Sequence, residues 1–142
     1  MKVHIITVGS PKQAYAKAGW VEYWDRLAHY HQLRVTHIAD KHNDAAHFKA
    51  AIGQSYSVGL VVNGEEFSSP QLARFMESRA IDGREISFSI GGPDGLPPEI
   101  LARLNYAWSY GDLTFPHDLA MIILLESLYR ASTISAGLPY HH

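Results

Sequence analysis

Hydrophobic and polar residues follow two different periods along this chain, and the period switches at regular intervals. Residues 1–8 form a mostly apolar run that stops at Gly9-Ser10-Pro11, which is typical of a buried strand followed by a turn. From residue 12 to residue 30 the apolar positions recur every three or four residues, which is the period of an amphipathic helix. The chain therefore opens with a strand and a helix.

The same patterns predict four further strands and four further helices. Ser68 and Gln71 have the spacing of a capping box and Pro70 suits a first helical turn. The predicted strands are residues 33–39, 57–62, 85–90 and 112–115, and the predicted helices are residues 43–52, 68–83, 97–106 and 118–135. Strands that alternate with helices are typical of an α/β fold with a parallel sheet and helices on both faces, here as one domain over residues 1–142.

In such folds ligands bind in the loops beyond the carboxyl ends of the strands, here residues 9–12, 60–69, 90–97 and 108–117. The segment Gly91-Gly92-Pro93-Asp94-Gly95 would let a flat group approach the backbone closely. It lacks the spacing of a dinucleotide fingerprint, and no Gly-Lys-Ser/Thr follows it as in a phosphate-binding loop. Taken alone, it fits a tight strand-to-helix turn equally well.

Composition narrows the class of protein. The chain has no cysteine, which excludes disulfides and thiolate metal sites, and no apolar run is long enough for a signal peptide or a membrane span. We therefore expect a soluble, cytoplasmic protein with no membrane partner. Its net charge of −2 does not suggest a binder of bulk nucleic acid.

The charge distribution is less even than the total. Residues 1–50 hold seven Lys and Arg against four Asp and Glu, with six of the nine His, whereas residues 51–142 hold five against ten. This asymmetry is either ordinary surface scatter or the sign of an RNA-facing side on the first half.

Several polar residues are candidates for chemistry. Glu126 and Arg130 are four residues apart on the last predicted helix. This spacing fits either a surface ion pair or a charged pair that points into a cleft and holds a polar substrate. His117 precedes that helix and is more typical of a structural than of a catalytic histidine. His37, His42 and His47 are spaced by five across a strand, a loop and a helix, without matching carboxylate geometry, so we expect no metal site.

Taken in order, these segments resemble the RlmH family of SPOUT-class RNA methyltransferases over essentially the whole chain. The motifs that carry the resemblance are Ile90-Gly91-Gly92-x-x-Gly95, Leu113-Thr114-Phe115-Pro116-His117, Leu125-Glu126-Ser127-Leu128-Tyr129-Arg130-Ala131 and Pro139-Tyr140-His141. Each is weak alone, but four in order and correctly spaced make a specific signature.

The resemblance implies a deep trefoil knot in the C-terminal half of the α/β sheet and S-adenosylmethionine as the cofactor. Carried over by motif, the implied cofactor contacts are Leu60, Gly91, Tyr110, Gly111, Asp112, Leu113, Thr114 and Phe115. It also implies a homodimer, in which the partner's C-terminal tail completes the substrate site. The implied substrate is a pseudouridine in 23S ribosomal RNA, methylated at N3 on assembled ribosomes.

The implied reaction is an in-line displacement in which N3 attacks the sulfonium methyl group and loses its proton. The catalytic candidates are Glu126, Arg130, Tyr140 and His141, with Arg130 orienting the base or its phosphate and His141 or Glu126 taking the proton. Two alternatives stay open: a non-catalytic ribosome-binding module that keeps the cofactor fold, and a SPOUT methyltransferase that acts on transfer RNA. Four positions lack charges typical of the family: Ser10, Val61, Met121 and His142.

Overall fold

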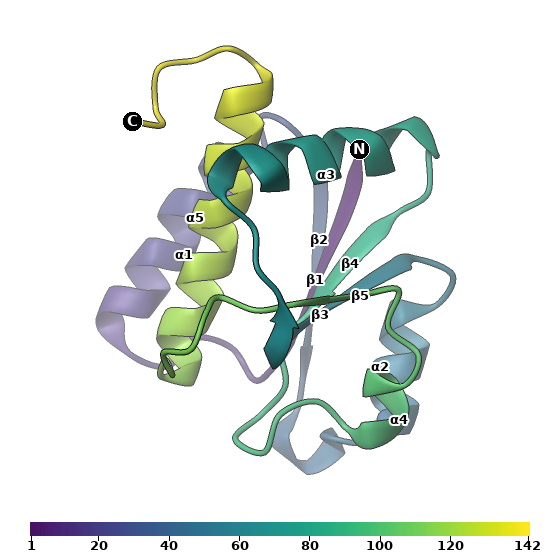
Figure 1. Cartoon of the computed structure of the whole chain (residues 1–142). Coiled ribbons are helices and arrows are strands. Elements are labelled where there is room, and N and C mark those ends of the chain that lie inside the picture. Colours follow the sequence, from purple (N-terminus) through teal and green to yellow (C-terminus); the bar gives the residue numbers. More distant parts are fainter.

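The computed structural model describes residues 1–142 and contains a five-stranded parallel sheet with helices on both faces (Figure 1). The strands are β1 (Lys2–Val8), β2 (Gln32–Ile38), β3 (Tyr56–Glu65), β4 (Ile86–Ser89) and β5 (Tyr106–Trp108). The helices are α1 (Ala14–Leu27), α2 (Ala45–Ile52), α3 (Ser69–Ile81), α4 (Pro98–Leu101) and α5 (His117–Ser135), with a 3₁₀ turn, η1 (Asp40–His42), before α2. The predicted α/β class is confirmed.

The strand order is β2-β1-β4-β3-β5, so β4 inserts between strands that precede it in the sequence. All pairs are parallel, as in β1 with β4, where Ile5 lies opposite Phe88. The pairing of β3 with β5 is irregular, because Trp108 pairs with both Leu60 and Glu65. The chain thus loops out between Leu60 and Glu65 around the end of β5. The deep knot itself stays a prediction from the resemblance.

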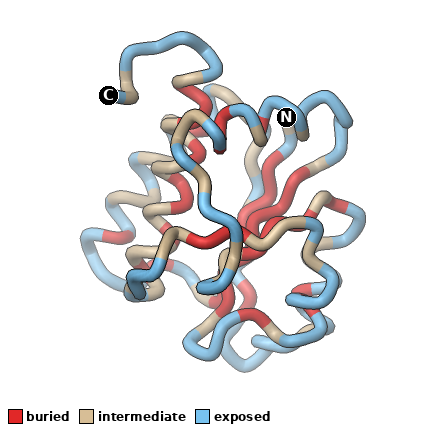
Figure 2. The backbone as a smooth tube through the Cα atoms, in the orientation of Figure 1, coloured by how far each residue is buried: buried red, intermediate tan, exposed pale blue.

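The two faces of the sheet have separate hydrophobic cores. Helices α1, α3 and α5 cover the larger core, in which Phe88, Trp108 and Leu125 are buried. Helices α2 and α4 cover a smaller one around Ile6, Phe48 and Ile100. Figure 2 shows the buried backbone running along the strands at the centre, with exposed segments on the outside. This layering sets the carboxyl ends of the strands at one edge, where the loops meet.

Two predicted elements need correction. The fifth strand is Tyr106–Trp108, not residues 112–115, which form a loop in which Leu113 is 76% exposed. A three-residue strand is too short for periodicity to detect, and the later apolar-polar alternation belongs to residues at the rim of a cavity.

Helix α4 ends at Leu101 rather than near residue 106. The chain turns because the backbone N–H of Asn105 donates to the carbonyl of Ser57 in β3 at 2.9 Å, which leads directly into β5. The capping box predicted at Ser68 and Gln71 is present and begins α3. No helix is both long enough and apolar enough to cross a bilayer.

Candidate functional site

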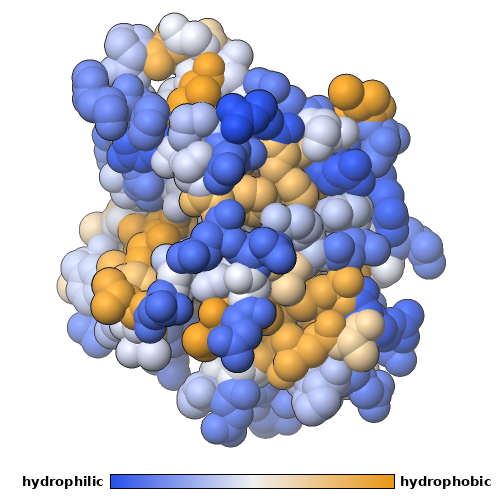
Figure 3. Space-filling model, viewed as in Figure 1, coloured by the Kyte–Doolittle hydropathy of each residue, from blue (hydrophilic) through white to orange (hydrophobic).

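Three loops at the carboxyl edge of the sheet enclose a cavity of about 660 Å³, within the usual range for small-molecule sites. They follow β3, β4 and β5, and the cavity extends to the first turns of α5 at His117 and Ala120. Figure 3 shows apolar side chains gathered over the lower half of this face of the molecule. The three loops expected to bind a ligand therefore converge on one site, and the fourth, residues 9–12, lies against the start of α5.

The glycine loop after β4 is built for close approach of the backbone. A Cβ atom on Gly91 would lie 2.3 Å from the carbonyl carbon of Gly95 and 2.5 Å from the amide nitrogen of Leu96, so no side chain fits there. Gly95 N–H donates to the Gly92 carbonyl at 2.9 Å, and Gly95 has a φ of +80°, which favours glycine. The loop is both a tight turn and one wall of the cavity.

The stretch after β5 forms the opposite wall and is fixed by partly buried hydrogen bonds. Ser109 Oγ donates to the Val62 carbonyl at 2.9 Å and accepts from Gly111 N–H at 3.0 Å, which ties this stretch to the loop after β3. Tyr110 Oη donates to the Ala120 carbonyl at 3.0 Å, and burial raises the pKa of this phenol well above its ordinary value. Ser109 was not predicted, because a single hydroxyl after a strand gives no sequence signal.

Seven of the eight residues predicted to contact the cofactor line the cavity: Leu60, Gly91, Tyr110, Gly111, Leu113, Thr114 and Phe115. The exception is Asp112, which is exposed and lies outside the cavity wall. Its carboxylate stays in water, as expected for an unpaired charge.

The charge of the cavity bears on what it could hold. No Lys or Arg lines it, and Asp94 is its only carboxylate. A site for a phosphate-bearing nucleotide would need cationic groups or a helix N-terminus with the matching loop. An apolar slot with main-chain groups at its edge and one carboxylate instead suits a ligand that joins a neutral flat heterocycle to a separate positive charge. The residues present therefore fit S-adenosylmethionine, whose sulfonium is cationic.

The N-terminal end of α5 is tied to the first strand and helix. His117 Nε2 hydrogen-bonds to the Val8 carbonyl at 2.6 Å. The buried carboxylate of Asp118 accepts from the backbone N–H groups of Lys12, at 3.0 Å, and Gln13, at 2.7 Å. These bonds give His117 the structural role expected of it. Asp118 was not predicted, because its partners are backbone groups more than a hundred residues away.

The four predicted catalytic residues also come together, but at the other end of α5. Glu126 Oε1 accepts from Arg130 Nε at 2.9 Å, from Arg130 Nη2 at 2.6 Å and from Tyr140 Oη at 3.1 Å. Arg130 Nη1 donates to His141 Nδ1 at 3.2 Å, and its guanidinium lies over the Tyr140 ring. We call Glu126, Arg130, Tyr140 and His141 the tail cluster. Its members are half-buried.

Hydrogen bonding constrains the protonation of the tail cluster. The pKa of Arg130 is raised by its bonds to Glu126, and burial raises that of Tyr140 above its ordinary range, so Tyr140 stays a donor. Because an arginine only donates, His141 Nδ1 accepts and the proton of the neutral ring lies on Nε2. Glu126 Oε1 already accepts three bonds. In this arrangement the cluster presents a cationic guanidinium beside donor groups, and Glu126 Oε2 takes part in none of these hydrogen bonds.

The cavity and the tail cluster are separate within one chain. Ala120 lines the cavity and Arg130 lies ten residues further along α5, which at about 1.5 Å per residue is about 15 Å. In Figure 1 the C-terminal tail folds over the upper end of α5, away from the loops at its lower end. One chain alone therefore does not bring the tail cluster to the cavity.

Two further predictions concern histidines and missing charges. His37 lies apart from the other two candidate histidines: it hydrogen-bonds to Thr7 Oγ1 at 2.7 Å and its ring packs against Trp20. His42 and His47 stack on each other beside Asp44, so two of the three histidines do have a carboxylate close by, which the sequence spacing did not indicate. Met121, where the resembled family has an arginine, is fully buried in the larger core, so its position supports packing rather than contact with a ligand.

Comparison with known proteins places this fold and site in a family. Residues 1–141 match the family model described as "Predicted SPOUT methyltransferase". The proteins named "Ribosomal RNA large subunit methyltransferase H" from Deinococcus deserti and Deinococcus radiodurans are 46% and 48% identical to this chain, each over 99% of both sequences.

A solved structure described as "a probable methylase family protein" from Haemophilus influenzae aligns with 99% of this chain and 70% of its own, with a TM-score of 0.60 at 12% identity. At 12% identity, this structural similarity supports the fold alone. The sequence matches, in contrast, span the chain from end to end, through the glycine loop and the tail cluster. The chain belongs to the RlmH family of SPOUT methyltransferases.

Proposed function

We propose that this protein methylates ribosomal RNA, transferring a methyl group from S-adenosylmethionine to N3 of a pseudouridine in the 23S RNA of the large ribosomal subunit. The observation that carries the proposal is a glycine-lined cavity without Lys or Arg, in a chain that matches relatives named for large-subunit RNA methylation along its whole length. An enzyme with this substrate works in the cytoplasm, on assembled ribosomes.

The cavity would hold the cofactor chiefly through its backbone. Leu60, Gly91 and residues 110–115, apart from the side chain of Asp112, would surround the adenine and exclude water. When bound, S-adenosylmethionine supplies an electrophilic methyl group on a sulfonium. The chain's contribution is alignment, since holding two reactants in near-attack geometry can remove about 7–11 kcal/mol of a barrier.

The tail cluster would act on the uracil ring. Arg130 carries a permanent positive charge and is oriented by Glu126, so it would bind the base or its phosphate and stabilise the anion left when N3 loses its proton. Tyr140 and His141 would position Arg130 and line the path of the proton. His141 would accept the proton once its bond to Arg130 opens, or Glu126 would accept it at Oε2, since the three hydrogen bonds of this carboxylate all go to Oε1.

The separation of cavity and tail cluster leads us to propose a homodimer in which each chain's tail reaches the partner's cavity. Apolar groups are exposed at both places: Leu113 at the cavity rim is 76% exposed and Leu138 in the tail is 51% exposed. A second copy that covered both would bury apolar surface twice, because a two-fold interface repeats each contact.

The central test is methyl transfer to ribosomes from a strain that lacks this activity. Labelled S-adenosylmethionine is incubated with the protein and either large subunits, whole ribosomes or isolated transfer RNA, and the modified nucleoside is identified by mass spectrometry. The proposal expects label in 23S pseudouridine at N3. Label only in transfer RNA would favour the transfer RNA alternative. Cofactor binding without transfer to any substrate would favour a non-catalytic ribosome-binding module.

The dimer is tested by mixing two inactive variants. Gly91→Val destroys one cavity and Arg130→Ala one tail, so each homodimer is inactive. Co-expressed with different tags, they form mixed dimers in which one site combines an intact cavity with the partner's intact tail. Tails that act across the interface would restore one of the two sites in each mixed dimer, about half of the wild-type activity once the mixed dimers are isolated through both tags. No recovery in the mixed dimers, with both variants folded, would place tail and cavity in the same chain.

A further inference from the structure

The segment that joins η1 to α2 brings two imidazoles and a carboxylate together on the surface. Ligand atoms of His42, Asp44 and His47 all lie within 4.8 Å of one another. The two imidazole rings stack with centroids 4.3 Å apart and planes 15° from parallel, and Asp44 Oδ1 lies 2.7 Å from His47 Nδ1. We propose that these three residues bind a divalent transition-metal ion, of which Zn²⁺ is the type case.

The donor set determines which ions fit. Two imidazole nitrogens and one carboxylate oxygen suit Zn²⁺, Ni²⁺ or Cu²⁺, whereas Mg²⁺ and Ca²⁺ prefer oxygen ligands only. Bonds to Zn²⁺ are about 2.0–2.2 Å, so ligands around one ion lie about 3–4 Å apart. All three side chains are exposed. They can therefore close the remaining distance by small rotations, and water would complete the coordination.

The helix geometry is compatible with metal binding. Asp44 is the N-cap of α2, and its Oδ1 accepts from the backbone N–H of His47 at 2.9 Å. Both hydrogen bonds of Asp44 go to this one oxygen, so the other oxygen is available to an ion while the cap is kept. The partial positive charge of the helix N-terminus opposes a bound cation, and the adjacent carboxylate offsets it.

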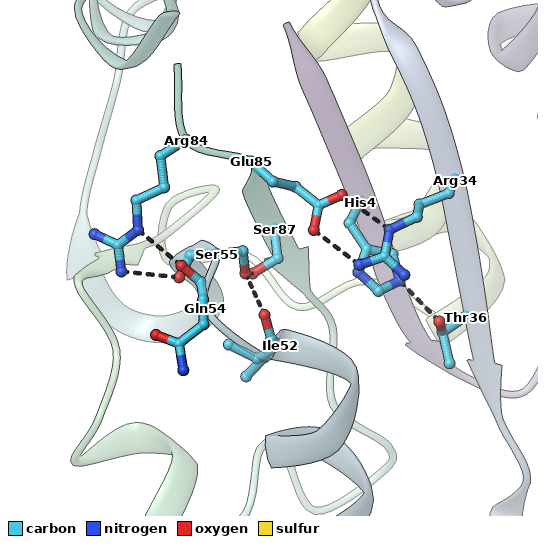
Figure 4. Close-up of polar contacts among 9 residues, drawn as sticks. All are labelled: His4, Arg34, Thr36, Ile52, Gln54, Ser55, Arg84, Glu85 and Ser87. Carbon is cyan, nitrogen blue, oxygen red and sulfur yellow. Dashed lines mark hydrogen bonds and ion pairs between the residues drawn. The ribbon is translucent and has the colours of Figure 1, made fainter. Parts of the chain in front are cut away.

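The surroundings give the site a concave setting. His42 and His47 line a cleft of about 630 Å³ between β2 and α2. The other end of this cleft is polar: Arg34 donates to Glu85 at 2.8 and 2.9 Å, beside the buried ring of His4 (Figure 4).

A bound ion would also affect the cofactor cavity. Asn43, between His42 and Asp44, packs against the glycine loop, where a Cβ atom on Gly92 would lie 2.8 Å from Asn43 Nδ2. An ion that ties His42 to His47 would fix this segment against that loop. We therefore expect metal binding to stabilise the protein as well as to occupy the site.

The test is calorimetric titration of the whole protein with ZnCl₂, with MgCl₂ as the ion that should not bind. The double variant His42→Gln/His47→Gln is expected to weaken Zn²⁺ binding at least about a hundredfold, and Asp44→Asn about tenfold. Asn also caps helices, so Asp44→Asn removes the carboxylate while the helix start is kept. Circular dichroism checks that each variant is folded.

A matched control is required because the tail ends in His141 and His142, which can also bind transition metals. The double variant His141→Gln/His142→Gln is expected to keep the site, with one Zn²⁺ per chain and a melting temperature that rises on its addition. Cu²⁺ bound to this control should show the electron paramagnetic resonance signature of imidazole nitrogen ligands. Zn²⁺ binding that is unchanged when His42→Gln/His47→Gln is made in this control, or that disappears in the control itself, would overturn the proposal.

Discussion

The two ends of helix α5 hold the two halves of the candidate site, and the two halves are formed by different kinds of chemical group. At its N-terminal end the cavity is lined by apolar side chains and by closely packed main chain: Gly91 leaves no room for a side chain, and Gly111 has a φ of +112°. At its C-terminal end the tail cluster consists of side chains that bind one another, with Glu126 Oε1 at its centre.

This difference predicts which amino-acid substitutions each end of α5 tolerates. Where the cavity wall is backbone, as at the glycine loop, the site is sensitive to the gain of a Cβ atom for which there is no room. A site made of charged side chains loses its function when one partner is truncated, because the others are left unpaired. Mutations at the two ends should therefore separate cofactor binding from turnover.

The largest effect is expected at the tail cluster. Arg130→Ala should lower turnover by about 100–1000-fold, as for the loss of a donor that stabilises developing negative charge. Affinity for S-adenosylmethionine, measured by calorimetry, should stay within about twofold of wild type, since one missing contact elsewhere costs no binding energy at the cavity. Arg130→Lys keeps the charge without the bidentate fork and should be intermediate. If Arg130→Ala also loses affinity for S-adenosylmethionine, the tail cluster takes part in cofactor binding, and the proposed division of roles is wrong.

The opposite pattern is expected at the cavity. Gly91→Ala introduces a Cβ atom 2.3 Å from the carbonyl carbon of Gly95, which the loop relieves only by moving. The displaced backbone should weaken S-adenosylmethionine binding by about a hundredfold, close to 3 kcal/mol. Asp112→Ala is the matched control, because Asp112 is exposed beside the same cavity. Equal affinities of Gly91→Ala and wild type would mean that the cofactor binds elsewhere.

The third effect concerns how the N-terminal end of α5 is held. Asp118→Ala removes the carboxylate that accepts from Lys12 N–H and Gln13 N–H, and should lower the free energy of unfolding by about 2 kcal/mol. Asp118→Asn keeps one acceptor oxygen and should lose less. Urea denaturation gives the values, with the exposed Asp25→Ala expected within about 0.5 kcal/mol of wild type. If Asp118→Ala leaves the free energy of unfolding unchanged, packing alone holds the start of α1 against the start of α5.

How far the sequence predicts these features depends on the range of the interactions. Local periodicity predicts most strands and helices, and the capping box at Ser68 and Gln71 lies within three residues. The glycine loop and the tail motifs are also local. Tertiary hydrogen bonds are not: Asp118 finds its partners more than a hundred residues away, and Asn105 ends α4 early by bonding to β3. Nor does the sequence show that cavity and tail cluster lie at opposite ends of one helix.

The fourth effect is a pH dependence at the tail end of α5. His31 Nε2 hydrogen-bonds to Ser132 Oγ at 2.9 Å, and burial, with the nearby N-terminal amine, lowers the pKa of His31 to about 4. The unfolded chain protonates this ring near pH 6.5, so it binds more protons than the folded protein between pH 6.5 and 4. Stability is therefore full above pH 6.5 and falls as the pH decreases toward 4.

This contribution is isolated by comparing wild type with His31→Gln. His4 and His37 also have lowered pKa values because of burial, and they add to the acid sensitivity of both proteins equally. Allowing for partial solvent screening, wild type should lose about 1–2 kcal/mol more than His31→Gln between pH 6.5 and 4, measured by urea denaturation at each pH. Parallel stability curves for the two proteins would remove His31 as the cause.

The smallest effect separates positioning from charge within the tail cluster. Tyr140→Phe deletes only the hydroxyl that donates to Glu126 Oε1 at 3.1 Å and keeps the ring against Tyr129 and beneath the Arg130 guanidinium. Two bonds from Arg130 still hold Glu126, so turnover should fall only about fivefold, the worth of one hydrogen bond of about 1 kcal/mol. The pH–rate profile should keep its shape, because Tyr140 stays protonated through the neutral range. A loss as large as that of Arg130→Ala, or a shifted profile, would instead give the phenol a direct part in proton transfer.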